Sequence, residues 1–95
     1  MDPLERLQRW YLAQCDGEWE HVYGVEVGTL DNPGWTVKID LTDTALSAVP
    51  FDRLEAHYTD DDWVVCRVEG YSFHAACGPL NLEEALEVFL DWAAG

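Results

Sequence analysis

The chain has 95 residues, 48% of them hydrophobic, which is the usual size of one domain (residues 1–95) with a single core. Nineteen acidic and five basic residues give a formal net charge of −14, which disfavours direct binding to nucleic acid or anionic lipid. Such a surface attracts a basic protein partner, although acidic residues also simply keep proteins soluble. The N-terminus lacks the basic start and apolar stretch of a signal peptide, so we expect a cytoplasmic protein.

The N-terminal segment that begins DPLE is typical of a helix start. Asp2 can cap the helix, the proline that follows suits the first helical position, and Glu5 stands where a capping box needs an acid. Apolar residues recur at helical spacing as far as Tyr11, and Gly17 favours a stop. We therefore expect a helix from about residue 3 to about residue 15.

A β-hairpin is expected next, because from Glu18 the hydrophobic period changes to two. The alternation places Trp19 on one face and Glu18 and Glu20 on the other, which would be the sheet face away from the helices. The sequence DNPG at residues 31–34 predicts a turn, since proline fixes φ and glycine accepts a positive φ. The alternation then resumes from Trp35 to Leu41 as the second strand.

Three further strands are expected near residues 53–58, 63–69 and 71–75, separated by an aspartate turn at residues 60–62 and by Gly70. Asn81 and Glu84 suggest a second capping box, which begins a C-terminal helix. Short turns between strands imply antiparallel neighbours, and two amphipathic helices need a sheet to cover. The sequence thus predicts an α+β fold: a single antiparallel meander sheet of about five strands, with the N-terminal and C-terminal helices packed on one face.

The stretch QCDGEWEH brings together a thiol, carboxylates and an imidazole, and three interpretations are open: a structural seam, a metal site or a Cys–His nucleophile pair. A zinc site needs three or four converging ligands, and only His57 and His74 could add further imidazoles. Cys15 is at the C-terminal end of a helix among acidic residues, which disfavour a thiolate. We expect a seam with no catalytic, cofactor or metal role, and the alternative is a small cytoplasmic enzyme that uses Cys15 and His21.

The cysteines and tryptophans have simpler interpretations. Three cysteines are an odd number without a CxxC pair, so we expect buried or partly buried free thiols. The five tryptophans fall on the predicted core faces or close to them. One or two of them could lie at the sheet rim as interface anchors.

Three features are distinctive in combination: the WY…QCDGEWEH…YG segment, the TLDNPGW turn and the NLEE…FLDW ending. Together with the surrounding LQRWYLAQCDGEWEHVYGVEVGTLDNPGWTVKIDL and DDWVVCRVEGYSFHAACGPLNLEEALEVFLDW, they resemble the immunity protein 53 family of bacterial polymorphic-toxin systems. The resemblance covers nearly the whole chain. It implies an α+β protein that binds and neutralises a cognate toxin delivered between competing bacteria, without catalysis and without a cofactor.

The net charge of the chain indicates which class of toxin this resemblance implies. An acidic protein can occupy the nucleic-acid groove of a basic nuclease, so we expect a basic, nuclease-type toxin and no direct contact with nucleic acid or membrane. The candidate partner-binding residues share a polar or acidic side chain at an exposed position: Glu18, Glu20, Asp31, Asn32, Asp60, Asp61 and Asp62.

Overall fold

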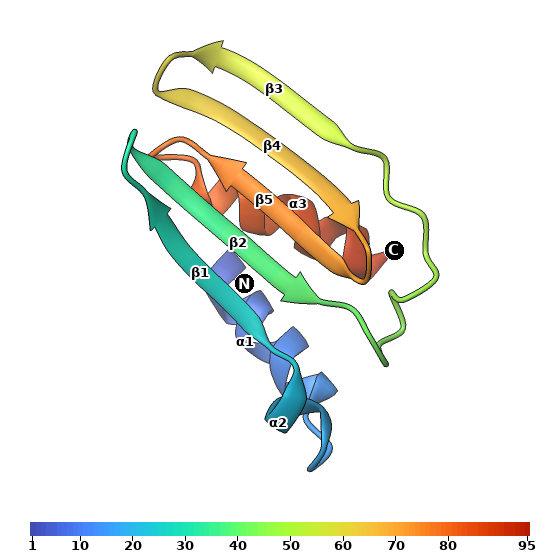
Figure 1. Cartoon of the computed structure of the whole chain (residues 1–95). Coiled ribbons are helices and arrows are strands. Elements are labelled where there is room, and N and C mark those ends of the chain that lie inside the picture. The colour runs from blue at the N-terminus through green and yellow to red at the C-terminus, as the bar shows by residue number, and fades with distance from the viewer.

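A computed structural model describes every residue from Met1 to Gly95. The elements run in the order α1 (Pro3–Gln14), α2 (Trp19–Val22), β1 (Val25–Leu30), β2 (Gly34–Asp40), β3 (Leu54–Thr59), β4 (Asp62–Glu69), β5 (Ser72–Cys77) and α3 (Leu82–Ala94). The five strands form one antiparallel sheet, with α1 and α3 on the same side of it (Figure 1). The α+β prediction is confirmed. None of the helices is long and apolar enough to cross a membrane.

The strand order is β1-β2-β5-β4-β3, which departs from a simple meander. The expected β1–β2 hairpin is confirmed, but the neighbour of β2 is β5, paired antiparallel with Val37 opposite Ala75. The connection from residue 41 to residue 53 carries the chain from β2 to the far edge of the sheet (Figure 1). It is held there because Phe51 packs edge to face on Phe73, at 5.5 Å between ring centroids. A meander requires every connection to join neighbouring strands. The connection from β2 to β3 instead joins two strands that are separated by β5 and β4.

The first strand was expected to begin at Glu18, and this start is wrong. Residues 19–22 form the short helix α2, and β1 begins at Val25. The carboxylate of Asp16 accepts hydrogen bonds of 2.9 Å from the backbone N–H groups of Glu18, the N-cap of α2, and Trp19, its first residue. These local bonds outweigh the two-residue alternation of the side chains. Glu18 and Glu20 therefore do not lie on a sheet face.

The two helix starts were predicted from similar signals and differ in detail. In α1 the backbone N–H of Glu5 donates to Asp2 Oδ1 at 2.8 Å, so the expected cap is confirmed. Asn81 does precede α3, but its side chain accepts no backbone N–H, so the second capping box is wrong. Its Nδ2 donates instead to Asp62 Oδ1 at 2.7 Å and to Glu84 Oε1 at 3.0 Å. The residue serves as a tie between α3 and the start of β4.

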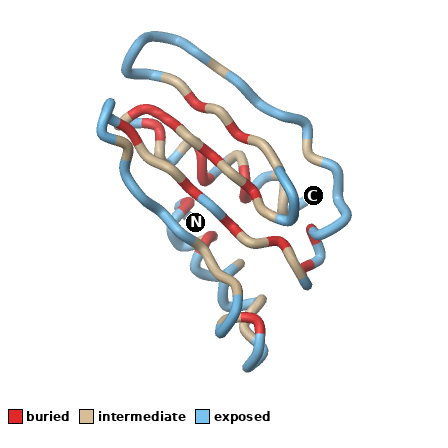
Figure 2. The backbone as a smooth tube through the Cα atoms, viewed as in Figure 1, coloured by how far each residue is buried: buried red, intermediate tan, exposed pale blue.

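The core lies between the central strands and the two long helices. Phe73 on β5 and Phe89 on α3 are fully buried, with ring centroids 5.1 Å apart. Trp10 on α1 meets Phe89 edge to face at 5.0 Å, which brings α1 against α3. Burial is concentrated in β2, β5 and β4, whereas the edge strands β1 and β3 are largely exposed (Figure 2). One face of the sheet is thus covered by helices, and the other remains open.

Candidate functional site

The stretch QCDGEWEH, for which three interpretations were open, forms a seam between α1 and α2 that is packed around Trp19. This indole is 4% exposed, its Nε1 donates to the carbonyl oxygen of Thr42 at 2.9 Å, and its ring meets that of Trp10 edge to face at 6.1 Å. The carboxylate of Glu20 accepts hydrogen bonds from the backbone N–H groups of Asp16 and Gly17. The expected structural seam is confirmed, although it joins two helices instead of a helix and a strand.

The backbone also explains the acidity of the two carboxylates in this seam. Hydrogen bonds from the N–H groups of Trp19 and Glu18 hold the pKa of Asp16 below its ordinary value. The pKa of Glu20 is lowered in the same way, by its own N–H group and those of Asp16 and Gly17. Both carboxylates are therefore engaged in folding the seam.

Cys15 and His21 do not form a contact that would serve catalysis. The Cys15 Sγ lies 3.3 Å from the carbonyl oxygen of Tyr11, to which it donates, and His21 is exposed on α2. No group of three or more His, Cys, Asp or Glu side chains could hold a metal ion. The other two cysteines are buried free thiols, as expected, and burial raises the pKa of Cys66 to about 12. A thiol with that pKa is protonated at neutral pH and is a poor nucleophile.

Five of the seven predicted partner-binding residues lie together at one end of the sheet. The β1–β2 turn carries Asp31 and Asn32, the β3–β4 turn carries Asp60 and Asp61, and Asp62 begins β4. Trp35 and Val64 are both paired with Cys77, so β2 and β4 begin where β5 ends. Figure 1 shows the two turns at the same end of the sheet. We call this surface the turn end; it comprises the residues Asp31, Asn32, Asp60, Asp61 and Asp62.

Close backbone contacts fix the geometry of the turn end. A Cβ on Gly78 would lie 2.4 Å from the carbonyl oxygen of Asp61, and a Cβ on Gly34 would lie 2.2 Å from that of Cys77. Glycine is thus required at both positions for the strands to approach. Asp62 is tied to Asn81, whereas the side chains of Asp60 and Asp61 make no hydrogen bond or ion pair. Asp60 and Asp61 are therefore free to meet a partner.

Glu18 and Glu20 lie at the opposite end of the sheet from the turn end. Helix α2 runs directly into β1, and the N–H of Gly24 donates to Asp40 Oδ2 at 3.0 Å, next to the end of β2 (Figure 1). Glu18 is exposed, while Glu20 is partly buried by its backbone hydrogen bonds. The fold therefore separates these two residues from the other five.

The open sheet face holds a group of residues that the sequence patterns did not single out. It consists of the side chains that alternate with the buried ones along the strands, together with Arg53: Glu26, Gly28, Thr36, Lys38, Asp40, Arg53, Glu55, His57, Trp63, Val65, Arg67, Glu69, Ser72, His74 and Ala76. This face bears three of the five basic residues and two of the three histidines of the chain, with only four of the nineteen acidic residues. The remaining surface is correspondingly more acidic.

Three of these side chains form a row across neighbouring strands, which we call the cationic row: Lys38, His74 and Arg67. Lys38 is paired with His74 between β2 and β5, and Arg67 is paired with His74 between β5 and β4. Burial and the charges of Arg67 and Lys38 lower the pKa of His74, against the opposing influence of Glu69 and Asp40. The row adjoins a shallow hollow of about 670 Å³ on the open face.

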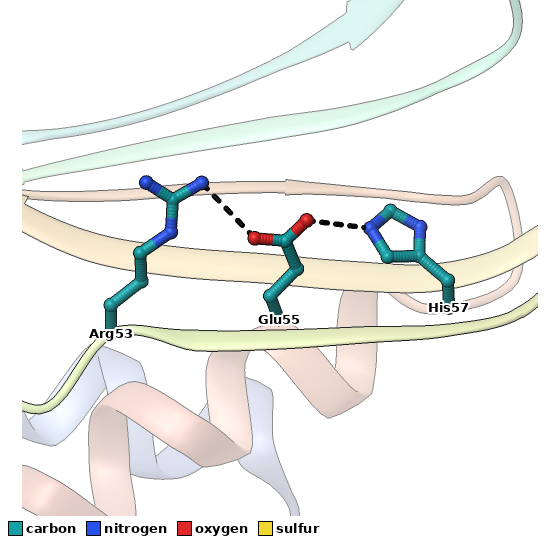
Figure 3. A network of polar contacts seen from close by, with 3 residues as sticks. All are labelled: Arg53, Glu55 and His57. Atoms are coloured by element: carbon teal, nitrogen blue, oxygen red, sulfur yellow. Dashed lines mark hydrogen bonds and ion pairs between the residues drawn. The ribbon is translucent and has the colours of Figure 1, made fainter.

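A second polar group on the open face lies along β3. Arg53 Nη2 is 3.2 Å from Glu55 Oε2, and His57 Nε2 is 3.0 Å from Glu55 Oε1 (Figure 3). Hydrogen bonding with His57, and the charge of Arg53, lower the pKa of Glu55. His57 also stacks on Trp63, with ring centroids 6.3 Å apart. Arg53 and His57 thus already have an acidic partner, and Trp63 is the tryptophan that lies on the open face and not in the core.

The sequence contained part of the signal for the cationic row. Lys38, Arg67 and His74 each alternate with buried residues along their own strands. These side chains become neighbours only because β2 pairs with β5, which joins segments more than thirty residues apart. Side-chain alternation within a strand does not carry that information.

Comparisons with known proteins identify the family of the chain. No curated protein and no solved structure matches the chain. The model of a protein family described as immunity protein 53 matches residues 4–94, which include the whole sheet, all of α3 and all of α1 except Pro3. The chain therefore belongs to the immunity protein 53 family.

Proposed function

We propose that this immunity protein neutralises a basic, nuclease-type toxin by covering its nucleic-acid groove in the cytoplasm of the producing cell. Membership of an immunity-protein family implies binding to a cognate toxin, without catalysis by the chain itself. The formal net charge of −14 supports a basic partner, because opposite charges speed association and fix orientation. The groove of a nuclease is the surface that such a partner would expose.

The turn end is the surface that we assign to the first contact with this toxin. The observation that carries the assignment is that two turns, far apart in sequence, place five acidic or polar side chains at one end of the sheet. No lysine or arginine occurs in the segments that form this end, at residues 30–34, 59–64 and 77–84. Glu18 and Glu20 form a second, smaller candidate contact at the other end.

The test measures binding to the toxin encoded beside the gene, over a series of salt concentrations. Replacing Asp60 and Asp61 together by Asn should lower the association rate severalfold at low salt and flatten its salt dependence, because charges are screened over ~8–10 Å. The matched control replaces two other exposed acids, Asp52→Asn and Glu87→Gln, which removes the same charge elsewhere. Glu18→Gln tests the second candidate contact by itself.

Three outcomes distinguish the parts of this proposal. If the parent neither binds the toxin nor protects cells that express it, the proposed function is wrong. If the parent binds but the Asp60/Asp61 variant associates like the control, the turn end serves solubility and the contact lies elsewhere. Cys15→Ser and His21→Gln should both keep protection, and loss of protection by a folded variant that still binds toxin would reinstate a chemical role.

A further inference from the structure

The open sheet face and the rest of the surface differ in charge, and this difference bears on how the toxin is recognised. We propose that the cationic row of Lys38, His74 and Arg67 binds a carboxylate on the surface of the cognate toxin, whose neighbouring atoms fill the hollow beside the row. The inference rests on the proposed function, since it names a contact with the same partner. It adds a recognition site that net charge alone would not lead one to seek.

The first argument is that the cationic row is only partly neutralised within the chain. Lys38 is exposed and forms no ion pair within 4.0 Å, although Glu26 is its register partner on β1. The ring of His74 makes no hydrogen bond, while Arg67 contacts Glu69 through Nε at 3.0 Å and leaves its terminal N–H groups available. Lys38 and the terminal N–H groups of Arg67 thus lie on either side of His74 without an acceptor of their own.

The nearest acid on β2 is already engaged elsewhere. Asp40 Oδ2 accepts the N–H of Gly24 at 3.0 Å, and its Oδ1 accepts the hydroxyl of Ser72 at 3.2 Å. Asp40 therefore ties the start of β1 and the start of β5 to β2, and both of its oxygens face partners of their own. Glu26 also borders the hollow but forms no ion pair with Lys38, so a carboxylate that binds both Lys38 and the terminal N–H groups of Arg67 would come from another molecule.

The second argument is the space beside the row. The next row of outward side chains runs from Gly28 through Thr36 to Ala76, which are register partners on β1, β2 and β5. All three are small, and they line the hollow of about 670 Å³ together with Lys38 and His74. A side chain or loop of a partner can lie over this row while its carboxylate reaches the cations.

The third argument identifies the occupant as a carboxylate of a protein and not as nucleic acid. A phosphate backbone brings a dense line of negative charge, which a chain with a net charge of −14 repels. On a toxin that is otherwise basic, a single Asp or Glu can bind the cationic row while the basic groups of the toxin face the acidic turn end. Opposite signs at separate places on one interface also fix the orientation of docking.

The decisive experiment measures whether the removal of one positive charge strengthens or weakens binding to the toxin encoded beside the gene. Lys38→Gln and Arg9→Gln both remove one positive charge, and Arg9 lies on α1 away from the open face. If only net charge mattered, both variants would bind a basic toxin slightly better. We expect Lys38→Gln to bind about tenfold more weakly, Arg9→Gln to bind like the parent or better, and Lys38→Arg to retain affinity.

A second variant tests the hollow independently of charge. Ala76→Leu adds bulk to its floor and should weaken binding about tenfold or more, whereas Ala45→Leu, at an exposed position in the connection after β2, should not. Circular dichroism and thermal melting check that each variant is folded.

The outcomes separate this inference from the proposed function. If the parent does not bind the toxin, the proposed function is wrong and this contact falls with it. If the parent binds and folded Lys38→Gln binds as tightly as Arg9→Gln, immunity stands and the carboxylate site is wrong. Weak binding by Lys38→Gln and Ala76→Leu, with both controls tight, supports the site.

Discussion

The turn end and the open sheet face belong to the same five strands but gather their charged side chains by different routes. The turn end takes its aspartates from two tight turns, where acidic and polar residues are favoured by the backbone itself. The open face takes Lys38, His74 and Arg67 from the middle of three strands, which become neighbours only after β5 is placed between β2 and β4. One surface follows from local sequence, and the other follows from topology.

This difference shows why a net charge describes such a small protein poorly. The value of −14 averages a strongly acidic periphery with a sheet face on which basic and acidic residues nearly balance. In the proposed complex, a basic toxin that docks across both regions would be attracted by the first and oriented by the second. Variants that disturb one region and spare the other can therefore break or sharpen the comparison.

The largest effect is expected where both regions depend on one contact, the close approach of β2 to β5. Gly34→Ala would place a Cβ 2.2 Å from the carbonyl oxygen of Cys77, which is backbone and cannot turn away. We expect a loss of about 3 kcal/mol in the free energy of unfolding, from overpacking that pushes these strands apart. Denaturant unfolding measures the loss, and binding at the turn end and at the cationic row should weaken together.

Gly28→Ala is the matched control for that variant. Its Cβ would meet only the hydroxyl oxygen of Thr36, at 3.2 Å, and this side chain can rotate. A change below about 1 kcal/mol is expected, because a glycine inside a strand is itself mildly unfavourable. Equal losses in the two variants would show that the approach of β2 to β5 has no special role in placing the two surfaces.

A smaller effect should divide the turn end into structural and binding acids. Asp62 accepts a 2.7 Å hydrogen bond from Asn81, which is 6% exposed. Asp62→Ala leaves that buried amide with one acceptor fewer, so we expect a loss of about 1–2 kcal/mol. Asp60→Ala should stay within about 0.5 kcal/mol, since its side chain makes no contact of this kind. Thermal melting of both variants measures the difference, and equal stabilities would place Asp62 among the free acids.

The same comparison shows how much of the fold and of the candidate site could be predicted from the sequence alone. Both long helices, the β1–β2 hairpin and the turn at residues 60–62 were predicted, because each has a local signal in caps, alternation or turn residues. Helix α2 was missed because the hydrogen bonds that Asp16 accepts from the backbone outweigh an alternating pattern of side chains. The cationic row was missed because no local pattern reports which strands are neighbours.

Glu20 offers a test at the third region, the seam, where an acid predicted to bind a partner serves the fold. Its carboxylate accepts the N–H groups of Asp16 and Gly17, and its pKa is lowered by backbone hydrogen bonds. That stabilisation is present above about pH 4.5 and is lost as pH falls through the lowered pKa. Glu20→Gln should therefore lower the melting temperature at pH 7 and narrow the gap to the parent in acid. Glu18→Gln, which lacks these bonds, should melt like the parent at both pH values.

The smallest effect concerns the protonation of His74 on the open face. Burial and the positive charges of Arg67 and Lys38 lower its pKa, while Asp40 on β2 and Glu69 on β4 act in the opposite direction. The unfolded chain therefore binds a proton more readily than the folded one near pH 6. As pH falls through the unfolded value of about 6.5, the folded state loses stability, and the loss levels off below the lowered pKa.

His74→Gln should remove that loss, so its melting temperature should fall less than that of the parent between pH 8 and pH 5. His21→Gln, on α2 and away from Lys38 and Arg67, is the control and should follow the parent. In the toxin complex the sign reverses, because a carboxylate against the cationic row favours protonated His74, and binding should tighten as pH falls. A complex whose affinity weakens over the same range, in the parent and in His74→Gln alike, would mean that no toxin carboxylate faces this row.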